Sequence, residues 1–506
     1  MPLDRQLCYR ALRARDARFD GRFFTAVRTT GIYCRPICPA QTPKLEHIEF
    51  FASAAAAHEA GFRPCLRCRP EVSPRFAAWR GTWNTVARAL LLIDQGALDT
   101  GDVEALATRL GMGDRHLRRL FDKHLGAPPV AVAQTRRLQL AKQLLDETTL
   151  PVSHIAYSAG FGSVRRFNDV IRRTYDRSPS DIRKLKRGAM ATRQEHAAPD
   201  AEVTIKMPFA PPYYWEGLLA FLAGRAIPGV EVVDGDTYRR SIQHDGAAGI
   251  VDVRPMIADG YLLATIRFPS IPALGLIVER LRHLFDVGAD PVAITKTLRA
   301  DPRLADIVAQ YPGIRVPGAW DGFELAVRAV LGQQVSVRSA TGLAGKLVAT
   351  YGTALPDAYR VGGITHLFPT AATLASISSN DLASAIGVPK TRANAIVSIA
   401  RAVRENAMLL SPGVSLDDSV SVLTTLPGIG DWTAQYIAMR ALREPDAFPA
   451  SDLVLRQSIG GATAASPAEA VAAANGWRPW RAYAAMLLWT ARSHEPAWRL
   501  SIEGNV

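Results

Sequence analysis

Hydrophobic and polar positions follow different periods in the first two parts of the chain. Residues 1–80 are turn-rich and contain the aromatic and β-branched run RFFTAVRTTGIYC, which indicates short strands. Residues 84–187 instead show apolar positions spaced at i, i+3 and i+4, interrupted by glycine and proline. These patterns predict a small strand-containing domain followed by an all-helical one.

The second half of the chain shows a similar change of pattern. Residues 203–312 combine strand-like runs, VTIKMPF and YLLATIRF, with the amphipathic stretch LGLIVERLRHLFDV, which predicts an α+β domain. From about Phe323 to Ala497, within a predicted domain of residues 313–506, the pattern is helical almost throughout, broken at LPGIG and SPGVS. Residues 188–202 are small and polar without an apolar period, which predicts an exposed linker that tethers the two halves loosely. The expected fold is multidomain, mainly α with α+β parts.

A weak repeat within residues 102–183 predicts tandem helix-turn-helix motifs. VEALATRLGMGDRHLRRLFDKHLGAPP and VSHIAYSAGFGSVRRFNDVIRRTYDRSPS each run helix, glycine-containing turn, basic helix and proline stop. Opposite the apolar faces of the basic helices lie Arg115, Arg118 and Arg119 in the first and Arg165, Arg166, Arg172 and Arg173 in the second. Such helices fit a DNA major groove. The alternative is a pair of helical hairpins with solvated charged faces.

Charge supports a polyanionic partner. The 506 residues contain 60 Lys and Arg against 47 Asp and Glu, a net charge of +13. Nucleic acid and an anionic membrane surface both fit such a balance, but the basic residues gather between Arg109 and Arg187, on the predicted DNA-reading helices. No long apolar window or signal-peptide core is seen, so we expect a cytoplasmic protein without a membrane partner.

Four of the five cysteines form two closely spaced pairs, Cys34 with Cys38 and Cys65 with Cys68. In a reducing compartment this spacing predicts a tetrahedral zinc site. A closed structural site is one interpretation. The other is a reactive one, because a zinc-bound thiolate is deprotonated at neutral pH and stays nucleophilic, so it could accept an alkyl group beside DNA. Cys8 stands apart from the cluster.

A glycine-rich loop in the second half predicts a phosphate contact. LPGIG, residues 426–430, precedes a helix, and backbone N–H groups at such a turn suit a DNA phosphate. A plain helical hairpin is the alternative. Asp452 follows Gly430 at a distance of 22 residues, after a proline and a serine at a predicted helix start. By itself such an aspartate reads as a helix N-cap.

Residues 4–185 resemble the Ada family of methyl-sensing regulators, whose helix-turn-helix part is of the AraC type. The resemblance rests on FTAVRTTGIYCRPICPA, AGFRPCLRC and the tandem motifs. It implies that zinc-bound Cys34 takes a methyl group from a DNA methylphosphotriester, with Cys38, Cys65 and Cys68 as supporting ligands. It also implies promoter DNA and RNA polymerase as partners. Because no cysteine follows Cys68, we expect no direct repair of O6-methylguanine.

Residues 203–495 resemble the AlkA family of 3-methyladenine glycosylases within the helix-hairpin-helix superfamily. The resemblance rests on PPYYWEGLLAFLAGRAIPGVE, FELAVRAVLGQQVSV, LPGIGDWTAQYIAMRAL and WRPWRAYAAMLLW. It makes Asp452 the catalytic carboxylate. It implies further that Trp432, Tyr436 and Trp489 line the base pocket and that Gly428, Ile429 and Gly430 hold a DNA phosphate.

Two positions qualify this second resemblance. Relatives with lyase activity place a lysine where this chain has Trp432, so we expect hydrolysis without strand cleavage. The AlkA family has a leucine wedge where this chain has Gln334, which makes Gln334 a candidate wedge. Relatives with an iron–sulfur cluster need four further cysteines, which are missing here.

The sequence therefore predicts a bifunctional regulator and repair enzyme that acts on double-stranded DNA, both alkylated and promoter DNA. Methylation of Cys34 would remove one negative charge near a phosphate, which is worth roughly 1 to 3 kcal/mol and strengthens promoter binding. One rival is a DNA-binding regulator whose second half binds a cationic ligand without catalysis. Another is a repair enzyme whose helix-turn-helix region supplies only non-specific affinity.

Overall fold

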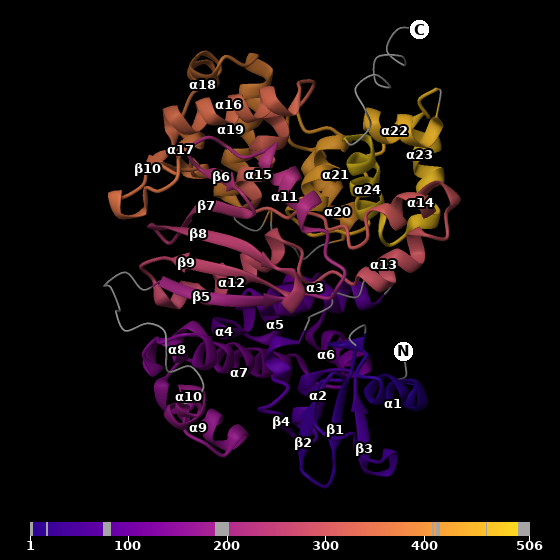
Figure 1. Ribbon diagram of the computed structural model, residues 1–506. Coiled ribbons are helices and arrows are strands. Elements are labelled where there is room, and N and C mark those ends of the chain that lie inside the picture. Colours follow the sequence, from indigo (N-terminus) through magenta and orange to yellow (C-terminus); the bar gives the residue numbers. More distant parts are fainter. Residues whose placement is uncertain are drawn as a thin grey trace. The chain divides into compact units, whose positions relative to one another are not determined.

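The computed structural model of the chain forms two compact units (Figure 1). It describes residues 4–16, 19–73, 82–187, 202–406, 409–410, 415–461 and 463–493. The first unit comprises Met1–Ala210, His244–Arg282 and Val287–Ala289, and the second comprises Pro211–Gln243, His283–Asp286 and Asp290–Val506. Apart from Glu202, the predicted linker lies outside the described residues. Within the described ranges, no helix has the length and apolar character needed to cross a membrane.

The first unit begins with a small four-stranded sheet of order β3-β1-β2-β4. Its strands are β1 (Phe24–Val27), β2 (Ile32–Cys34), β3 (Ile48–Phe51) and β4 (Arg63–Pro64). β1 pairs antiparallel with both β2 and β3, and β2 pairs parallel with β4. Two helices accompany the sheet, α1 (Arg5–Arg13) and α2 (Ala54–Glu59). The predicted short strands are therefore confirmed, and α1 is an addition that the sequence pattern did not reveal.

Eight helices follow and contain the two predicted helix-turn-helix motifs. They are α3 (Thr82–Asp94), α4 (Ala97–Thr100), α5 (Val103–Arg109), α6 (Asp114–Leu125), α7 (Pro129–Glu147), α8 (Val152–Ser158), α9 (Val164–Tyr175) and α10 (Pro179–Arg187). The first motif is α5–α6, the second is α8–α9, and α7 joins them. Glycines in left-handed backbone conformation, Gly111 and Gly160, make the two turns. The apolar residues at i, i+3 and i+4 spacing are buried, as Leu117 and Phe121 of α6 show.

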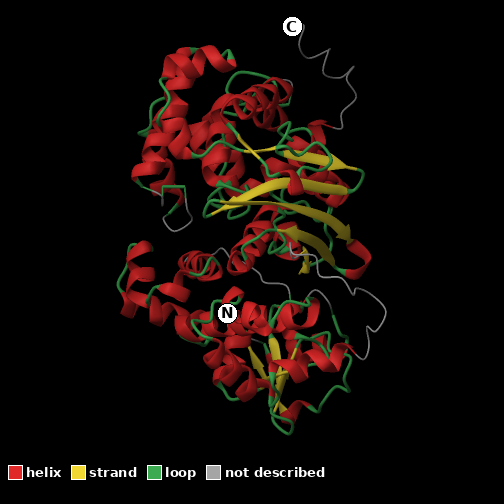
Figure 2. Cartoon of the chain, turned by 90° about the vertical axis from the view of Figure 1, so that its left-hand side faces the viewer, coloured by secondary structure: helices red, strands yellow, loops and turns green. Residues whose placement is uncertain are grey.

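Three antiparallel strands complete the sheet structure of the first unit (Figure 2). They are β5 (Glu202–Pro208), β8 (Ala247–Met256) and β9 (Tyr261–Arg267), with β9 between the others, and α12 (Leu274–Leu284) follows them. Helix α7 bonds to β5 at both backbone groups of Lys206: Gln143 Nε2 donates to its carbonyl at 2.8 Å, and its N–H donates to Glu147 Oε2 at 3.1 Å. The strand that directly follows the predicted linker is thus bonded to a helix of the same unit.

The second unit is helical apart from two small pairs of strands. The antiparallel strands β6 (Glu231–Asp234) and β7 (Thr237–His244) follow α11 (Trp215–Ala223). The remaining helices are α13 (Pro291–Leu298), α14 (Pro302–Gln310), α15 (Gly322–Leu331), α16 (Val337–Tyr351), α17 (Ala371–Ala375), α18 (Ser379–Ile386), α19 (Lys390–Glu405), α20 (Leu416–Thr424), α21 (Asp431–Arg440), α22 (Leu453–Gly460), α23 (Pro467–Ala474) and α24 (Arg481–Ser493). The two-residue strands β10 (Thr353–Ala354) and β11 (His366–Leu367) interrupt a stretch predicted as helical.

Candidate metal centre and active site

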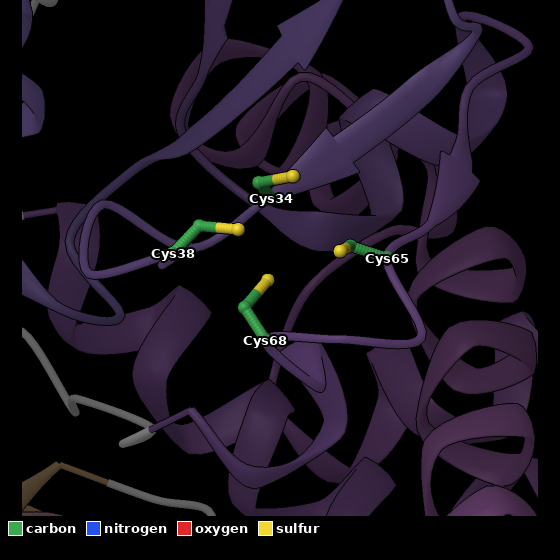
Figure 3. Close-up of side chains that lie close together, drawn as sticks. All are labelled: Cys34, Cys38, Cys65 and Cys68. Atoms are coloured by element: carbon green, nitrogen blue, oxygen red, sulfur yellow. The ribbon is translucent and has the colours of Figure 1, made fainter. Parts of the chain in front are cut away.

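The four paired cysteines meet in the first unit. Cys34 ends β2, Cys65 follows β4, and the parallel pairing of these strands brings the two pairs together. All four Sγ atoms lie within 4.8 Å of one another, and Figure 3 shows them pointing toward a common centre. Cys38 and Cys68 are buried, whereas Cys34 and Cys65 are half-buried. The structure thus unites the four predicted metal ligands.

This cluster has the chemistry and the size that a zinc ion requires. Hydrogen bonds among the thiols lower the pKa of Cys38 to about 7 and also lower that of Cys65, while they raise the pKa values of Cys34 and Cys68. The cluster therefore gathers negative charge that a divalent cation would neutralise. Zn–S bonds of about 2.3 Å in a tetrahedron put the sulfurs about 3.8 Å apart, which fits the observed limit. Cys8 takes no part, and burial raises its pKa to about 11.

The four sulfurs differ in their hydrogen bonds from the backbone. The Arg35 amide donates to Cys68 Sγ at 3.3 Å, and the amides of Ala40 and Cys68 stabilise the thiolates of Cys38 and Cys65.

Two arginines fix the loops that carry these ligands. Arg35 donates through Nε to Oδ1 of the buried Asp20 at 2.9 Å and through a terminal nitrogen to the Cys68 carbonyl at 3.1 Å. Arg69, directly after Cys68, adopts a φ of 53° and bonds to Glu71 at 3.0 Å and to Glu147 of α7 at 3.1 Å. The metal loop is thereby anchored to the DNA-binding helices.

The arginines of both predicted DNA-reading helices face solvent. Arg115, Arg118 and Arg119 lie on α6, and Arg165, Arg166, Arg172 and Arg173 lie on α9, all exposed. Only weak local contacts restrain them, such as Arg118 with Asp114 at 3.5 Å. Exposed arginines opposite a buried face are the arrangement that contacts phosphates and guanine edges.

The predicted phosphate loop lies in the second unit, between α20 and α21. Gly428 has a φ of +78°, and a Cβ there would come within 2.7 Å of Ala395 Cβ. Ile429 is buried and anchors the loop, while Gly430 is the N-cap residue of α21. Gln333 Nε2 donates to the Gly428 carbonyl at 2.9 Å, which ties the loop to the end of α15. The hairpin therefore offers the start of α21 to an anion.

Asp452 is at once a helix cap and the acceptor of two indole N–H groups. As N-cap of α22 it accepts a hydrogen bond from the Leu455 amide on Oδ1 at 3.1 Å. Trp489 Nε1 donates to the same oxygen at 3.1 Å, and Trp432 Nε1 donates to Oδ2 at 3.0 Å. The two tryptophans come from α24 and α21, so the hydrogen bonds hold the carboxylate between two helices far apart in sequence.

The aromatic side chains predicted for the base pocket lie together beside Asp452. The rings of Trp432 and Tyr436 stack with centroids 5.2 Å apart and an interplanar angle of 7°. Trp489 lies 6.4 Å from Tyr436 at a tilt of 59°. Such a group of electron-rich faces attracts a cationic heterocycle.

Gln334, the candidate wedge, lies at an exposed turn before α16. Its φ of 55° and its exposure project the side chain away from the core. Val335 and Val337 beside it are also exposed, at 38% and 44%. The turn therefore carries apolar surface next to the glutamine.

Several residues that shape these sites were not found from the sequence. Arg440 donates to the Tyr436 hydroxyl at 2.8 Å, and Arg392 donates to the Gln333 carbonyl at 2.5 Å. Arg440 lies one helical turn after Tyr436, so the i, i+4 spacing was an available signal. The contacts of Arg392 and Gln333 join segments distant in sequence and left no signal of this kind.

Four family descriptions match successive parts of the chain. They are the metal binding domain of Ada (residues 7–71), a helix-turn-helix domain (106–185), the AlkA N-terminal domain (204–321) and the HhH-GPD superfamily base excision DNA repair protein (327–480). The chain is 42% identical over 494 residues, 97% of both chains, to a probable bifunctional transcriptional activator/DNA repair enzyme AlkA of Mycobacterium tuberculosis (strain CDC 1551 / Oshkosh). It is 34% identical to DNA-3-methyladenine glycosylase 2 of Escherichia coli (strain K12), over 56% of this chain and 96% of that one.

A solved structure supports the fold of the second half. The 3-methyladenine DNA-glycosylase from Archaeoglobus fulgidus superposes with a TM-score of 0.51 at 22% identity, covering 57% of this chain and 98% of that one. At this identity the likeness concerns the fold alone.

Fold and sites together define a DNA-binding repair protein with an Ada-type zinc centre and a helix-hairpin-helix glycosylase domain. The chain belongs to the family of bifunctional transcriptional activator/DNA repair enzymes that join an Ada-type metal-binding and helix-turn-helix half to an AlkA-type half. The predicted resemblances to Ada and AlkA, the multidomain fold class and the zinc cofactor are thereby confirmed.

Proposed function

We propose that the second half excises alkylated purines such as 3-methyladenine by hydrolysis of the N-glycosidic bond. The carrying observation is the Asp452 carboxylate, held by indole N–H groups on each of its oxygens beside stacked aromatic rings. A purine alkylated at a ring nitrogen is cationic, so it suits the aromatic faces and leaves readily. The nucleotide must first be turned out of the duplex, which the exposed turn at Gln334 would assist.

Asp452 supplies the electrostatic part of this reaction. When the C1′–N bond breaks, its electron pair goes to the base, which leaves neutral, and the sugar becomes oxocarbenium-like. The fixed carboxylate stabilises that positive charge. It also orients a water molecule whose oxygen bonds to C1′ and whose proton passes to the carboxylate or to solvent. The hydrogen bonds to Trp432 and Trp489 keep the carboxylate in place through the step.

The same residues support hydrolysis without lyase activity. A lyase needs an amine that bonds covalently to C1′. At the position where lyase relatives have that lysine, this chain has Trp432, and its indole N–H is bonded to Asp452. The product is therefore an intact abasic site.

We infer that the first half accepts a methyl group on Cys34 from a DNA methylphosphotriester. Bound zinc would keep the cluster thiols deprotonated. Cys34 Sγ then bonds to the methyl carbon, the O–CH₃ bond breaks, and the phosphodiester leaves with the electron pair on its oxygen. Support comes from the match to the metal binding domain of Ada over residues 7–71, in which Cys34 is the first of the four cysteines, and from its half-buried position. The product is a neutral thioether.

Methylation of Cys34 would change DNA affinity through charge. Zinc with four thiolates carries about two negative charges, and the thioether removes one of them. Weaker repulsion of DNA phosphates, worth roughly 1 to 3 kcal/mol, would strengthen promoter binding by α6 and α9. The proposed partners are therefore alkylated DNA, promoter DNA and, for activation, RNA polymerase.

Base release with an Asp452→Asn variant tests the glycosylase proposal. Asparagine also caps helices well, so α22 should persist while the negative charge is lost. We expect the wild-type protein to release 3-methyladenine from alkylated duplex DNA. The variant should release it at a rate at least about 100-fold lower. The wild-type reaction should leave uncut abasic strands and give no adduct on borohydride treatment. Equal release by the two proteins would rule out this role for Asp452.

A further inference from the structure

Two guanidinium groups converge on the Tyr436 hydroxyl at the edge of the aromatic group. Arg440 donates to Tyr436 Oη at 2.8 Å. Arg225, just after α11, acts on the same phenol, and both guanidinium groups lie over the ring of Phe221, at 3.7 Å for Arg225 and 4.9 Å for Arg440. The Tyr436 hydroxyl oxygen therefore interacts with two cationic side chains that come from different parts of the chain.

These two cations have no carboxylate partner among the described residues. Arg440 is held by the carbonyls of Pro317 and Gly318, at 2.8 and 3.0 Å. Arg225 donates to the Phe221 carbonyl at 3.3 Å. The next cation, Arg328, differs because it pairs with Glu231 at 2.8 Å and with Glu324 at 3.1 Å. The positive charge at Tyr436 is therefore left unbalanced by acidic side chains.

Unbalanced positive charge conflicts with a cationic substrate. With a neutral phenol, the two guanidinium groups and the single carboxylate of Asp452 leave one net positive charge, which would repel an alkylated purine. Loss of the phenol proton to solvent brings the sum to zero. It also makes the Tyr436 ring, which stacks on Trp432, more electron-rich.

We propose that Tyr436 is a specificity-determining residue whose phenolate form Arg225 and Arg440 stabilise, so that the pocket selects cationic over neutral damaged bases more strongly as this phenol ionises. This assignment rests on the proposed glycosylase function and adds to it a residue that sets the preference for a cationic base. The pKa of the Tyr436 phenol is shifted in the direction that this proposal requires. Burial favours the neutral form, but the charges of Arg440, Arg225 and Arg328 prevail and lower the pKa of Tyr436 to about 8.

Titration of the phenol in the free protein tests the ionised state without any substrate. Every other described tyrosine with a shifted pKa is shifted upward, so a tyrosine that titrates below its usual range can be attributed to Tyr436. We expect tyrosinate absorbance, or ring resonances of labelled tyrosine, to show one group titrating near pH 8. Tyr436→Phe should abolish this step, and Arg225→Met should move it upward. Tyr483→Phe, on another buried tyrosine, is the control that should leave it in place. A wild-type protein in which no tyrosine titrates below about pH 9 would overturn the proposal.

Competition between two damaged bases tests the selectivity. Single-turnover release of 3-methyladenine, which is cationic in DNA, is compared with release of uncharged hypoxanthine at pH 7 and pH 8.5. The phenolate fraction of a group with a pKa near 8 rises from about one tenth to about three quarters over this interval. The ratio of the 3-methyladenine rate to the hypoxanthine rate should therefore rise severalfold between pH 7 and pH 8.5 in the wild type, relative to the same ratio in Tyr436→Phe. The variant corrects for any ionisation of the substrates, which is the same for both proteins. An unchanged relative ratio would overturn the selectivity, whereas a wild type that releases neither base would contradict the glycosylase activity and leave the titration result standing.

Discussion

At the residue scale, Asp452 unites two roles that the sequence presented as alternatives. It caps α22 through Leu455 and accepts indole hydrogen bonds from Trp432 and Trp489. The cap fixes the carboxylate relative to its own helix, and the indoles fix it relative to α21 and α24. A carboxylate that satisfies three donors does not need to rearrange when positive charge develops nearby.

Loss of one indole N–H should slow the chemical step. Trp489→Phe keeps an aromatic ring but removes the hydrogen bond to Asp452 Oδ1. A hydrogen bond to a charged group is worth about 1.5 to 3 kcal/mol, so the single-turnover rate of base release should fall roughly 10- to 100-fold. The melting temperature should change little, because Trp489 is only half-buried.

Trp477→Phe provides the matched control for this substitution. Trp477 Nε1 also donates to a carboxylate, but to that of Asp301, at 2.7 Å, and the Trp477 side chain is buried in the core. This variant should lose stability while the folded protein keeps its rate. Equal rate losses in both variants would show that the effect of Trp489 is only structural.

Site residues could be predicted from the sequence where they lie at short, characteristic spacings. The cysteine pairs meet because β2 and β4 are parallel neighbours, and their short spacings already suggested one site. The placement of Asp452 and the three pocket aromatics came from family resemblance rather than from spacing. Arg225 and Gln333 escaped notice because their contacts are set by tertiary packing, which a one-dimensional pattern does not contain.

At the element scale, the hairpin between α20 and α21 depends on one glycine. Gly428 combines a left-handed backbone with close contact to α19, and a Cβ would meet Ala395 at 2.7 Å. A side-chain rotation can relieve neither condition. The first is a backbone angle of residue 428 itself, and the second is a contact with the Ala395 methyl group, which has no other rotamer.

Gly428→Ala should therefore weaken DNA binding by the hairpin. A residue forced into positive φ costs about 1 to 2 kcal/mol, and displacement of α19 adds to that. We expect a lower melting temperature and roughly tenfold weaker binding to abasic duplex DNA in a fluorescence anisotropy titration.

Gly430→Ala, two residues away, is the appropriate comparison. Its backbone has an ordinary negative φ, and a Cβ there would meet nothing within 4 Å. Its effect should be limited to the loss of a favourable cap, about 1 kcal/mol or less. Equal losses of melting temperature and of DNA affinity in both variants would mean that the backbone conformation of Gly428 does not determine the shape of the hairpin.

Helices and strands with a clear period were predicted, and short elements were not. The runs VTIKMPF and YLLATIRF became β5 and β9, and the tandem motifs became α5–α6 and α8–α9. The two-residue strands β10 and β11 are too short to show alternation. Helix α1 was missed because its buried side, with Cys8, Ala11 and Leu12, lies within a stretch dominated by basic residues.

At the scale of the whole molecule, the pH dependence of stability offers a separate check on the second unit. Burial lowers the pKa of His283 well below its usual value, and Arg443 adds to this. Below pH ~6.5 the unfolded chain binds a proton at this histidine that the folded protein excludes. Stability is therefore complete above that pH and falls as the pH falls, by up to about 1.4 kcal/mol per pH unit.

His283→Gln should remove this dependence while keeping an N–H donor. We expect the difference in melting temperature, wild type minus variant, to be larger at pH 7.5 than at pH 5.5. A difference that stays constant between these pH values would contradict burial of a neutral His283.

In the proposed function, one chain senses alkylation at Cys34 and responds through its DNA-reading helices. A promoter fragment selected by the chain from random DNA provides the target for a gel-shift titration. Zinc-loaded protein is compared before and after reaction with methylphosphotriester DNA, with Cys34→Ser carried through the same steps. We expect the reaction to tighten promoter binding by the wild type about tenfold to hundredfold and to leave binding by the variant unchanged. Equal affinity of methylated and unmethylated wild type across salt concentrations would contradict it.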